Sequence, residues 1–235
     1  MNILGICHFS LYQNLTNSFV HHQMKTFVEL GHRVRMIIPI GYGKKNPDGK
    51  RFDNNVVRRM VDGVELVYVR YLTLSRYGEF GFNSGSAILS MLCKDRQLMK
   101  DFRADIIHAH TLGFDSQIGV WWTKRIKCPI IVTTHGSDTS VPYEKGKREY
   151  LNRCCKNVDC IVAVSSALAE KLRSCGTQTP IISILNGYDL ANLPPECDKQ
   201  ELSFLQVGNL IQSKRVNITI KAFAEIKTQY PEAKL

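Results

Sequence analysis

The chain has 235 residues, 44% hydrophobic and 22% charged, which is the composition of a globular protein with one large domain or one and a half. No apolar run approaches the ~20 residues that a membrane-spanning helix needs, and the first apolar run lacks the flanks of a signal peptide, so a cytoplasmic protein is expected. The formal net charge of +10 favours acidic partners, but no basic recognition-helix pattern accompanies it, which argues against nucleic acid as a partner.

Strand-like and helix-like segments alternate along the first 187 residues. Strands are expected at residues 2–7, 33–39, 64–71, 105–109, 130–134, 160–164 and 181–185. Helices are expected around residues 20–28, in a segment that ends near residue 102, and at residues 119–125 and 167–173. This alternation predicts an α/β protein with a Rossmann-like parallel sheet and helices on both faces.

Much of the positive charge falls between the second and third predicted strands. The basic residues there are Lys44, Lys45, Lys50, Arg51, Arg58 and Arg59, with glycine and proline among them, which predicts a loop. Two interpretations remain open: a solvated loop, or a contact with anionic lipid head groups or a phosphorylated acceptor. The second would make the chain a peripheral protein at the inner face of the membrane.

Cysteine and histidine residues do not form a metal-binding pattern. The eight cysteines lie mostly inside apolar strand or helix patterns, which favours reduced thiols over disulfides. His108 and His110 alternate at a strand end, so both side chains should lie on one face. A zinc site would need a second ligand pair with characteristic spacing, and none follows. No metal and no other cofactor is therefore expected.

The composition changes after residue 187. Residues 188–201 contain two consecutive prolines among charged residues, which predicts a linker. Beyond it, residues 203–207 look like a strand, and the segment after Ser213 looks like a helix with one apolar face. One strand and one helix cannot bury a core of their own, so a second Rossmann-like domain is expected to begin here and to remain incomplete within the 235 residues.

The most distinctive stretch of the sequence is IIVTTHGSD at residues 130–138. A buried strand ends directly before His135, Gly136, Ser137 and Asp138, and ligands of open α/β sheets bind at the carboxyl ends of strands. These four residues supply an imidazole, a close backbone approach, a hydroxyl and a carboxylate. His135 is either catalytic or a hydrogen-bonded structural residue.

Seven segments together resemble the family 4 glycosyltransferases in order and spacing. They are NILGIC (2–7), LGHRVRMIIP (30–39), ADIIHAH (104–110), IIVTTHGSD (130–138), CIVAVSSALAEKL (160–172), ISILNGYDL (182–190) and FLQVGNLIQSKRVNITIKAFAEI (204–226). That family has the GT-B architecture of two facing Rossmann-like domains. The resemblance implies that residues 1–187 form the amino-terminal, acceptor-side domain and that residues 202–235 begin a truncated donor-binding domain.

The resemblance also implies an activity. Family 4 enzymes transfer a sugar from an activated donor, usually a nucleotide sugar, to a glycan, lipid-linked or small-molecule acceptor, with retention of configuration and no essential metal. The family's later acidic motif, which binds the donor, does not occur within the 235 residues, so transfer by this chain alone is not expected. The alternative is a non-catalytic sugar- or nucleotide-binding module, or an inactive fragment of such an enzyme.

The resemblance assigns roles to residues of the first domain. His135 would face the donor sugar and act in catalysis, and Gly136 would permit the close approach. Ser165 begins a helix at the cleft and either contacts the substrate or only caps the helix. Asn186 belongs to the turn between domains, which a plain tight turn explains equally well.

The resemblance also assigns a diphosphate grip to the second domain. The family motif VGR...KG appears with Gly208, Asn209, Lys214 and Arg215. Asn209 replaces the family's arginine, which removes a charge-assisted phosphate contact, and Arg215 replaces a glycine and is a candidate to restore that charge. A second departure is at the amino terminus, where residues 16–18 replace the family's paired glycines.

Overall fold

The computed structural model describes residues 1–8, 19–42, 56–73, 82–94, 101–187, 200–208, 210 and 212–235. The chain divides into two compact units, Met1–Gly187 and Tyr188–Leu235.

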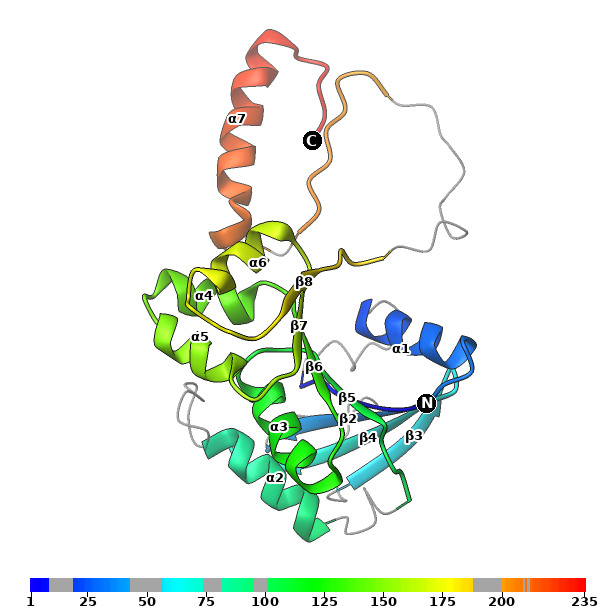
Figure 1. The fold of residues 1–235 in the computed structure, drawn as a ribbon. Helices are drawn as coiled ribbons and strands as arrows, with labels where there is room; N and C mark the ends of the chain where they lie inside the picture. Colours follow the sequence, from blue (N-terminus) through cyan, green and yellow to red (C-terminus); the bar gives the residue numbers. More distant parts are fainter. Residues whose placement is uncertain are drawn as a thin grey trace. The chain divides into compact units, whose positions relative to one another are not determined.

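In the described part of the first unit, eight strands form one sheet (Figure 1). They are β1 (Asn2–Ile6), β2 (Arg33–Gly41), β3 (Val56–Val61), β4 (Val64–Tyr71), β5 (Ile106–Ala109), β6 (Ile130–Thr134), β7 (Cys160–Ala163) and β8 (Ile181–Ser183). The strand order is β3-β4-β2-β1-β5-β6-β7-β8, and every pair is parallel except β3 with β4. The strand order reverses between β1 and β5, so these two strands define the topological switch point of the sheet.

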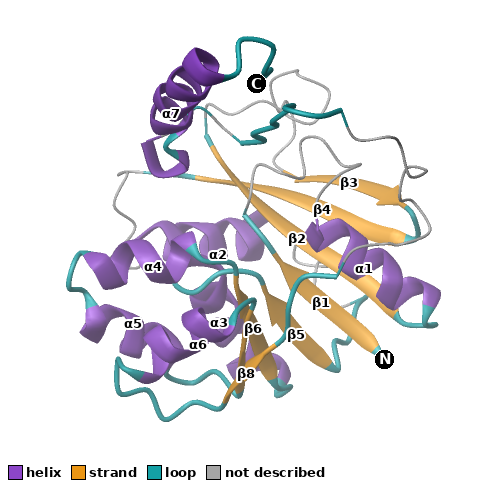
Figure 2. Ribbon diagram, turned by 90° about the horizontal axis from the view of Figure 1, so that it is seen from above, coloured by secondary structure: helices purple, strands orange, loops and turns teal. Residues whose placement is uncertain are grey.

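Helices cover both faces of the sheet, as predicted (Figure 2). They are α1 (Phe19–Glu29), α2 (Phe82–Lys94), α3 (Phe114–Ile126), α4 (Ser137–Glu144), α5 (Arg148–Cys155) and α6 (Ser166–Arg173). On one face, Met24 of α1 packs in a buried cluster with alternate residues of β1, β2 and β4. On the other face, Met91 of α2 and Ile118 of α3 pack against the remaining residues of the same strands. Because successive side chains of a strand point to opposite faces, both helix layers need apolar strands, which explains the long apolar runs.

The strand β3 was not predicted, because its arginines were assigned to the basic loop. Arg58 and Arg59 lie in β3, which pairs antiparallel with β4. The two strands are joined by Asp62 and Gly63, with φ values of 49° and 75°. An Asp-Gly pair between strand-like runs is a strong hairpin signal because both turn residues need positive φ. The other four residues of the predicted basic loop lie outside the described residues.

Two further differences concern helices. The helix expected to end near residue 102 corresponds to α2, whose described residues end at Lys94. Residues 102–104 have no regular structure. The helices α4 and α5 were not predicted. Pro142 interrupts the sequence pattern of α4, and its eight residues carry no apolar stripe.

The cysteines among the described residues are all free, as predicted. Burial raises the pKa of the Cys155 thiol to about 12, which keeps it protonated and unreactive at neutral pH. Cys197 lies outside the described residues.

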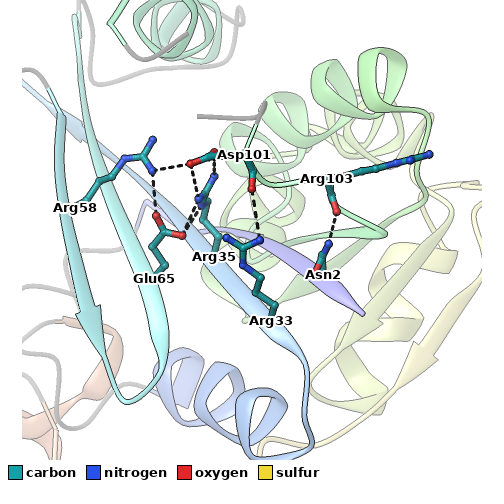
Figure 3. Close-up of polar contacts among 7 residues, drawn as sticks. All are labelled: Asn2, Arg33, Arg35, Arg58, Glu65, Asp101 and Arg103. Carbon is teal, nitrogen blue, oxygen red and sulfur yellow. Dashed lines mark hydrogen bonds and ion pairs between the residues drawn. The ribbon is translucent and has the colours of Figure 1, made fainter. Parts of the chain in front are cut away.

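A buried arginine ties three segments together at the amino-terminal end of the sheet (Figure 3). The side chain of Arg35 on β2 is 1% exposed and donates to Glu65 of β4 and to Asp101, each at 2.8 Å. Its guanidinium carbon lies 4.6 Å from the ring centroid of Phe102. Arg58 of β3 donates to Glu65 at 3.1 Å from a more exposed position. The hydrogen bond from Arg35 holds the pKa of the Asp101 carboxyl below its usual value.

In the described part of the second unit, one α-helix, α7 (Val216–Gln229), follows a 3-10 turn at Gln212–Lys214. The prediction of this helix is confirmed. The predicted strand at residues 203–207 is wrong within the described residues, where only Ser203 makes a β-bridge, with Lys234. Leu205 and Val207 are 88% and 86% exposed. Among the described residues the pairing stays limited to this bridge, in which the Phe204 N–H donates to the Lys234 carbonyl at 2.9 Å, and it does not extend into a ladder.

Candidate functional site

The candidate site lies where four adjacent strands of the first unit end. His8 follows β1, His110 follows β5, His135 follows β6 and Ser165 follows β7 within two residues. In this sheet β1, β5, β6 and β7 are neighbours and parallel, so their carboxyl ends meet at one edge. That edge contains the switch point between β1 and β5, the usual ligand position of an open α/β sheet.

The loop after β6 is organised by Asp138. One of its carboxylate oxygens accepts hydrogen bonds from the backbone N–H groups of His135 and Gly136, at 3.2 and 3.0 Å, and from the Thr134 hydroxyl at 2.9 Å. Its other oxygen accepts from the backbone N–H of Leu112 at 2.9 Å. Burial raises the pKa of Asp138, and these hydrogen bonds oppose that effect. The contacts show Asp138 fixing the loop, and a contact of Asp138 with a bound ligand, expected from its place at the strand end, stays a prediction.

Gly136 has a φ of 115°, in the region that favours glycine. A Cβ there would meet no atom of the described residues within 4 Å, so within this part of the chain the backbone conformation is what favours glycine. Ser137 is exposed as the first residue of α4. The four predicted residues after β6 are therefore brought together in one turn that leads into a helix.

Three histidine rings lie in succession at the ends of β5 and β6, and we call them the histidine stack. The ring centroids of His108 and His110 are 4.3 Å apart, as expected for side chains on one face of a strand. The rings of His110 and His135 are 5.8 Å apart and nearly parallel, with an angle of 12°. His108 shares a 2.8 Å hydrogen bond with the Thr133 hydroxyl. The ring of Phe19 on α1 lies 4.6 Å from that of His135.

All three rings of the histidine stack are neutral at physiological pH. Burial lowers the pKa of His108 to about 3 and that of His110 well below its ordinary value, with further lowering from the neighbouring imidazoles. Burial also lowers the pKa of His135 to about 4, against the attraction of the Asp115 carboxylate. A neutral imidazole can both donate and accept a hydrogen bond, which suits contact with a ligand hydroxyl.

The sequence did not identify His8 and Asp115 as site residues. The fully buried Asp115 carboxylate accepts from the His8 backbone N–H at 3.1 Å and lies 2.9 Å from the His8 ring nitrogen Nδ1. It also accepts from the Thr111 hydroxyl at 2.8 Å. The His8 side chain is 34% exposed at the end of β1. The signal was available, because His8 follows a central strand just as His135 does.

The other two predicted site residues of the first unit are Ser165 and Asn186. The Ser165 hydroxyl accepts from the Leu168 backbone N–H at 3.2 Å, so it caps α6 as the simpler interpretation expected. Asn186 is exposed after β8, near the end of the first unit. Ligand contacts by Ser165 and Asn186 stay predictions.

The predicted diphosphate grip lies in the second unit. A Cβ at Gly208 would lie 3.6 Å from Cγ of Lys214, so this backbone passes close to that side chain. The Gln206 amide donates to the Lys214 carbonyl at 3.1 Å. Lys214 and Arg215 are exposed, and Arg215 occupies the N-cap of α7 with a φ of 50°. Two cations thus stand at a helix N-terminus, where anions bind favourably. Asn209 lies outside the described residues.

Among the residues that the structure describes, no group of three or more histidine, cysteine, aspartate or glutamate side chains is arranged to hold a metal ion. None of the described helices has the length and apolar composition to cross a bilayer.

Acid is expected to destabilise the first unit through the histidine stack. The folded-state pKa values of His108 and His135, about 3 and 4, lie below the ordinary 6.5, so unfolding takes up protons between pH 6.5 and 4. Stability is therefore full above pH 6.5 and falls as the pH drops, by about 1.4 kcal/mol per pH unit for each such histidine. Urea unfolding followed by the fluorescence of Trp121 and Trp122 measures this slope.

The variant His108→Gln should show a shallower slope, whereas His22→Gln should not, because His22 is exposed on α1. An identical slope in His108→Gln and the unsubstituted protein would contradict a neutral His108.

The fold of the chain is similar to that of sucrose-phosphate synthase from Thermosynechococcus elongatus in two solved structures. The first match has a TM-score of 0.53 and 12% identity, and covers 81% of this chain and 90% of that chain. The second has a TM-score of 0.57 and 13% identity, and covers 80% of this chain and 49% of that chain. The chain thus spans about half the length of the second structure. No curated protein matches the chain in sequence.

These likenesses define the class of protein: an α/β chain with the Rossmann-like fold of about half of a GT-B enzyme. The sequence profile of Glycosyltransferase Family 4 matches residues 16–192, three quarters of the chain, and includes the histidine stack and the loop after β6. The chain belongs to Glycosyltransferase Family 4.

Proposed function

We propose that the chain serves a retaining glycosyltransferase that moves a sugar from a nucleotide-diphosphate donor to a glycan, lipid-linked or small-molecule acceptor. The observation that carries the proposal is the neutral His135, held at the carboxyl end of β6 by a loop that Asp138 fixes. Family membership supports the same reaction class.

A neutral imidazole suits the charge changes of this reaction. As the bond from the anomeric carbon to the diphosphate breaks, the electron pair leaves with the diphosphate and the sugar becomes oxocarbenium-like and positive. A charged imidazolium beside it would repel that positive charge. A neutral His135 can instead hold a sugar hydroxyl by a hydrogen bond and orient the donor.

The departing diphosphate needs positive charge. Lys214, Arg215 and the N-terminus of the 14-residue helix α7 supply it without a metal. In this scheme residues 1–187 form the acceptor-side domain, residues 188–201 are the linker, and residues 202–235 belong to the donor-binding domain. His135 would therefore act on the sugar while the second unit holds the diphosphate.

Lys214→Ala should weaken nucleotide-sugar binding by about 1.5 to 3 kcal/mol, the range for a hydrogen bond to a charged group. Titration calorimetry with a complete enzyme, meaning these residues joined to a full donor-binding domain, measures the change. Lys221→Ala is the matched control, because Lys221 is exposed within α7, away from its N-terminus. Equal affinity of the Lys214→Ala variant and the unsubstituted enzyme would make Lys214 a surface residue.

One observation favours a second candidate, a sugar- or nucleotide-binding module without turnover. The second unit leaves Leu205, Val207 and Leu210 more than 85% exposed, with no sheet among its described residues. Saturating the chain with several nucleotide sugars separates the two candidates. Binding together with product formation supports the enzyme, and binding without product, even in the complete enzyme, supports the module.

The expected location is the cytoplasm, with a peripheral contact at the inner face of the membrane as the extension of this proposal. The net charge of +10 suits anionic lipid, and a nucleic-acid partner is not proposed. Co-sedimentation with vesicles that contain anionic lipid, compared with neutral vesicles, tests the membrane contact.

A further inference from the structure

His110 is a buried polar residue whose presence is not explained by packing alone. Its side chain is fully buried, and neither ring nitrogen has a hydrogen-bond partner among the residues that the structure describes. Buried polar groups are nearly always paired, because an unpaired one loses its hydration without compensation. An apolar side chain would fill this position at lower cost, so the imidazole calls for a specific explanation.

The surroundings of His110 suggest what it does. Its ring lies between those of His108 and His135, at 4.3 and 5.8 Å, and is almost parallel to that of His135. The two rings are nearly parallel, and neither nitrogen of His110 is hydrogen-bonded to the His135 ring. The buried His110 ring therefore occupies the space beside the His135 ring, without a hydrogen bond through which the two could exchange a proton.

Nearby negative charge opposes the effect of burial on the pKa of His135. Asp115 on α3, to which His8 is hydrogen-bonded, attracts a proton to His135. Asp138 on α4 accepts from the His135 backbone N–H. On α1 the facing group is the uncharged ring of Phe19, and on β5 it is His108 and His110. Burial of the His135 ring outweighs the attraction of the Asp115 carboxylate and keeps the ring neutral.

We propose that His110 is a positioning residue of the glycosyltransferase site: by stacking on His135 and sealing that ring from water, it keeps His135 neutral and in one orientation. This inference rests on the proposed function for its catalytic meaning. The stacking and the water exclusion belong to the chain itself and are measurable without turnover.

The test is a pH titration of the full chain with ring-labelled histidine, followed by NMR. The resonances of His135 and His110 are assigned with the variants His135→Gln and His110→Phe. In the unsubstituted chain, His135 should titrate at least one pH unit below 6.5, and the midpoint of His110 should also lie well below 6.5. A His135 midpoint near 6.5 would overturn the proposal before any further variant is made.

Two variants of position 110 then test whether a ring at this position keeps water from His135. His110→Phe keeps a flat ring against His135, so the His135 midpoint should stay within about 0.5 pH units of its unsubstituted value. His110→Ala admits water, so the midpoint should rise by at least one unit, with His110→Thr as the substitute if the alanine variant does not fold. Tryptophan fluorescence from α3 and unchanged resonances of exposed His22 report an intact fold. The proposal would be overturned if the His135 midpoint did not rise in His110→Ala (or in its substitute His110→Thr), or if it rose equally in His110→Phe.

The role of His110 in catalysis is tested separately, by the pH dependence of the rate. In the complete enzyme, His110→Ala should move the acid limb of the pH–rate profile upward with the His135 midpoint, and His110→Phe should leave it in place. An acid limb that stays fixed while the midpoint moves would overturn the positioning role. If the midpoints behave as expected and no enzyme form transfers sugar, the proposed function fails while the sealing of His135 by His110 stands.

Discussion

Replacing His135 with alanine in a complete enzyme is expected to lower the rate of sugar transfer at least ~100-fold, with little loss of stability. The expectation follows from the position of His135 at the end of β6, where its neutral ring can hold a sugar hydroxyl. Its ring lies against those of Phe19 and His110 and is neutral, so removing it takes no charge out of the site. Initial rates at saturating donor measure the loss.

The matched control is His22→Ala, because His22 is exposed on α1 and outside the site. The control variant should retain the full rate. If His135→Ala were as active as His22→Ala, His135 would be a structural residue that ends a strand, and the site would have to be placed elsewhere.

The largest expected effect on stability is that of Arg35→Met. The methionine keeps the apolar stem near Phe102 but removes the positive charge that binds both Glu65 and Asp101. Removing one member of a buried ion network leaves the other charges without a partner, at a typical cost of about 3 to 5 kcal/mol of the free energy of unfolding. We expect about 3 kcal/mol, because Asp101 is half exposed and Glu65 keeps Arg58. Urea unfolding followed by tryptophan fluorescence measures the change in the first unit.

Arg58→Met serves as the control within the same network. The Arg58 side chain is 34% exposed, so its loss should cost about 1 kcal/mol or less. Equal losses for the two arginine variants would show that burial of Arg35 does not govern the strength of this network.

Much of the fold follows from sequence patterns that depend on local physics. The strands β1, β2, β4 and β6 are apolar runs between polar turns, and burial on both faces gives them a clear signature. The hairpin of β3 was missed because its arginines look solvated, whereas Arg58 is held by Glu65 across the hairpin. Helix α4 lacks a stripe of apolar residues, so only its packing in the tertiary structure makes it helical.

The site could be predicted only in part. The turn at residues 135–138 was recognisable because a buried strand ends in four polar or flexible residues. The histidine stack was not, because His110 and His135 are 25 positions apart and meet only through the pairing of β5 with β6. For the same reason the pairing of His8 with Asp115, 107 positions apart, leaves no local pattern.

The most direct test of the central claim is product analysis with the complete enzyme and a panel of labelled nucleotide sugars, with acceptors drawn from glycans, lipid extracts and small sugars. NMR of the product gives the anomeric configuration of the new bond. We predict transfer from at least one nucleotide sugar with retained configuration, and loss of that product in His135→Ala. A folded complete enzyme that binds nucleotide sugars but transfers none, or one that forms only the inverted product, would contradict the assignment.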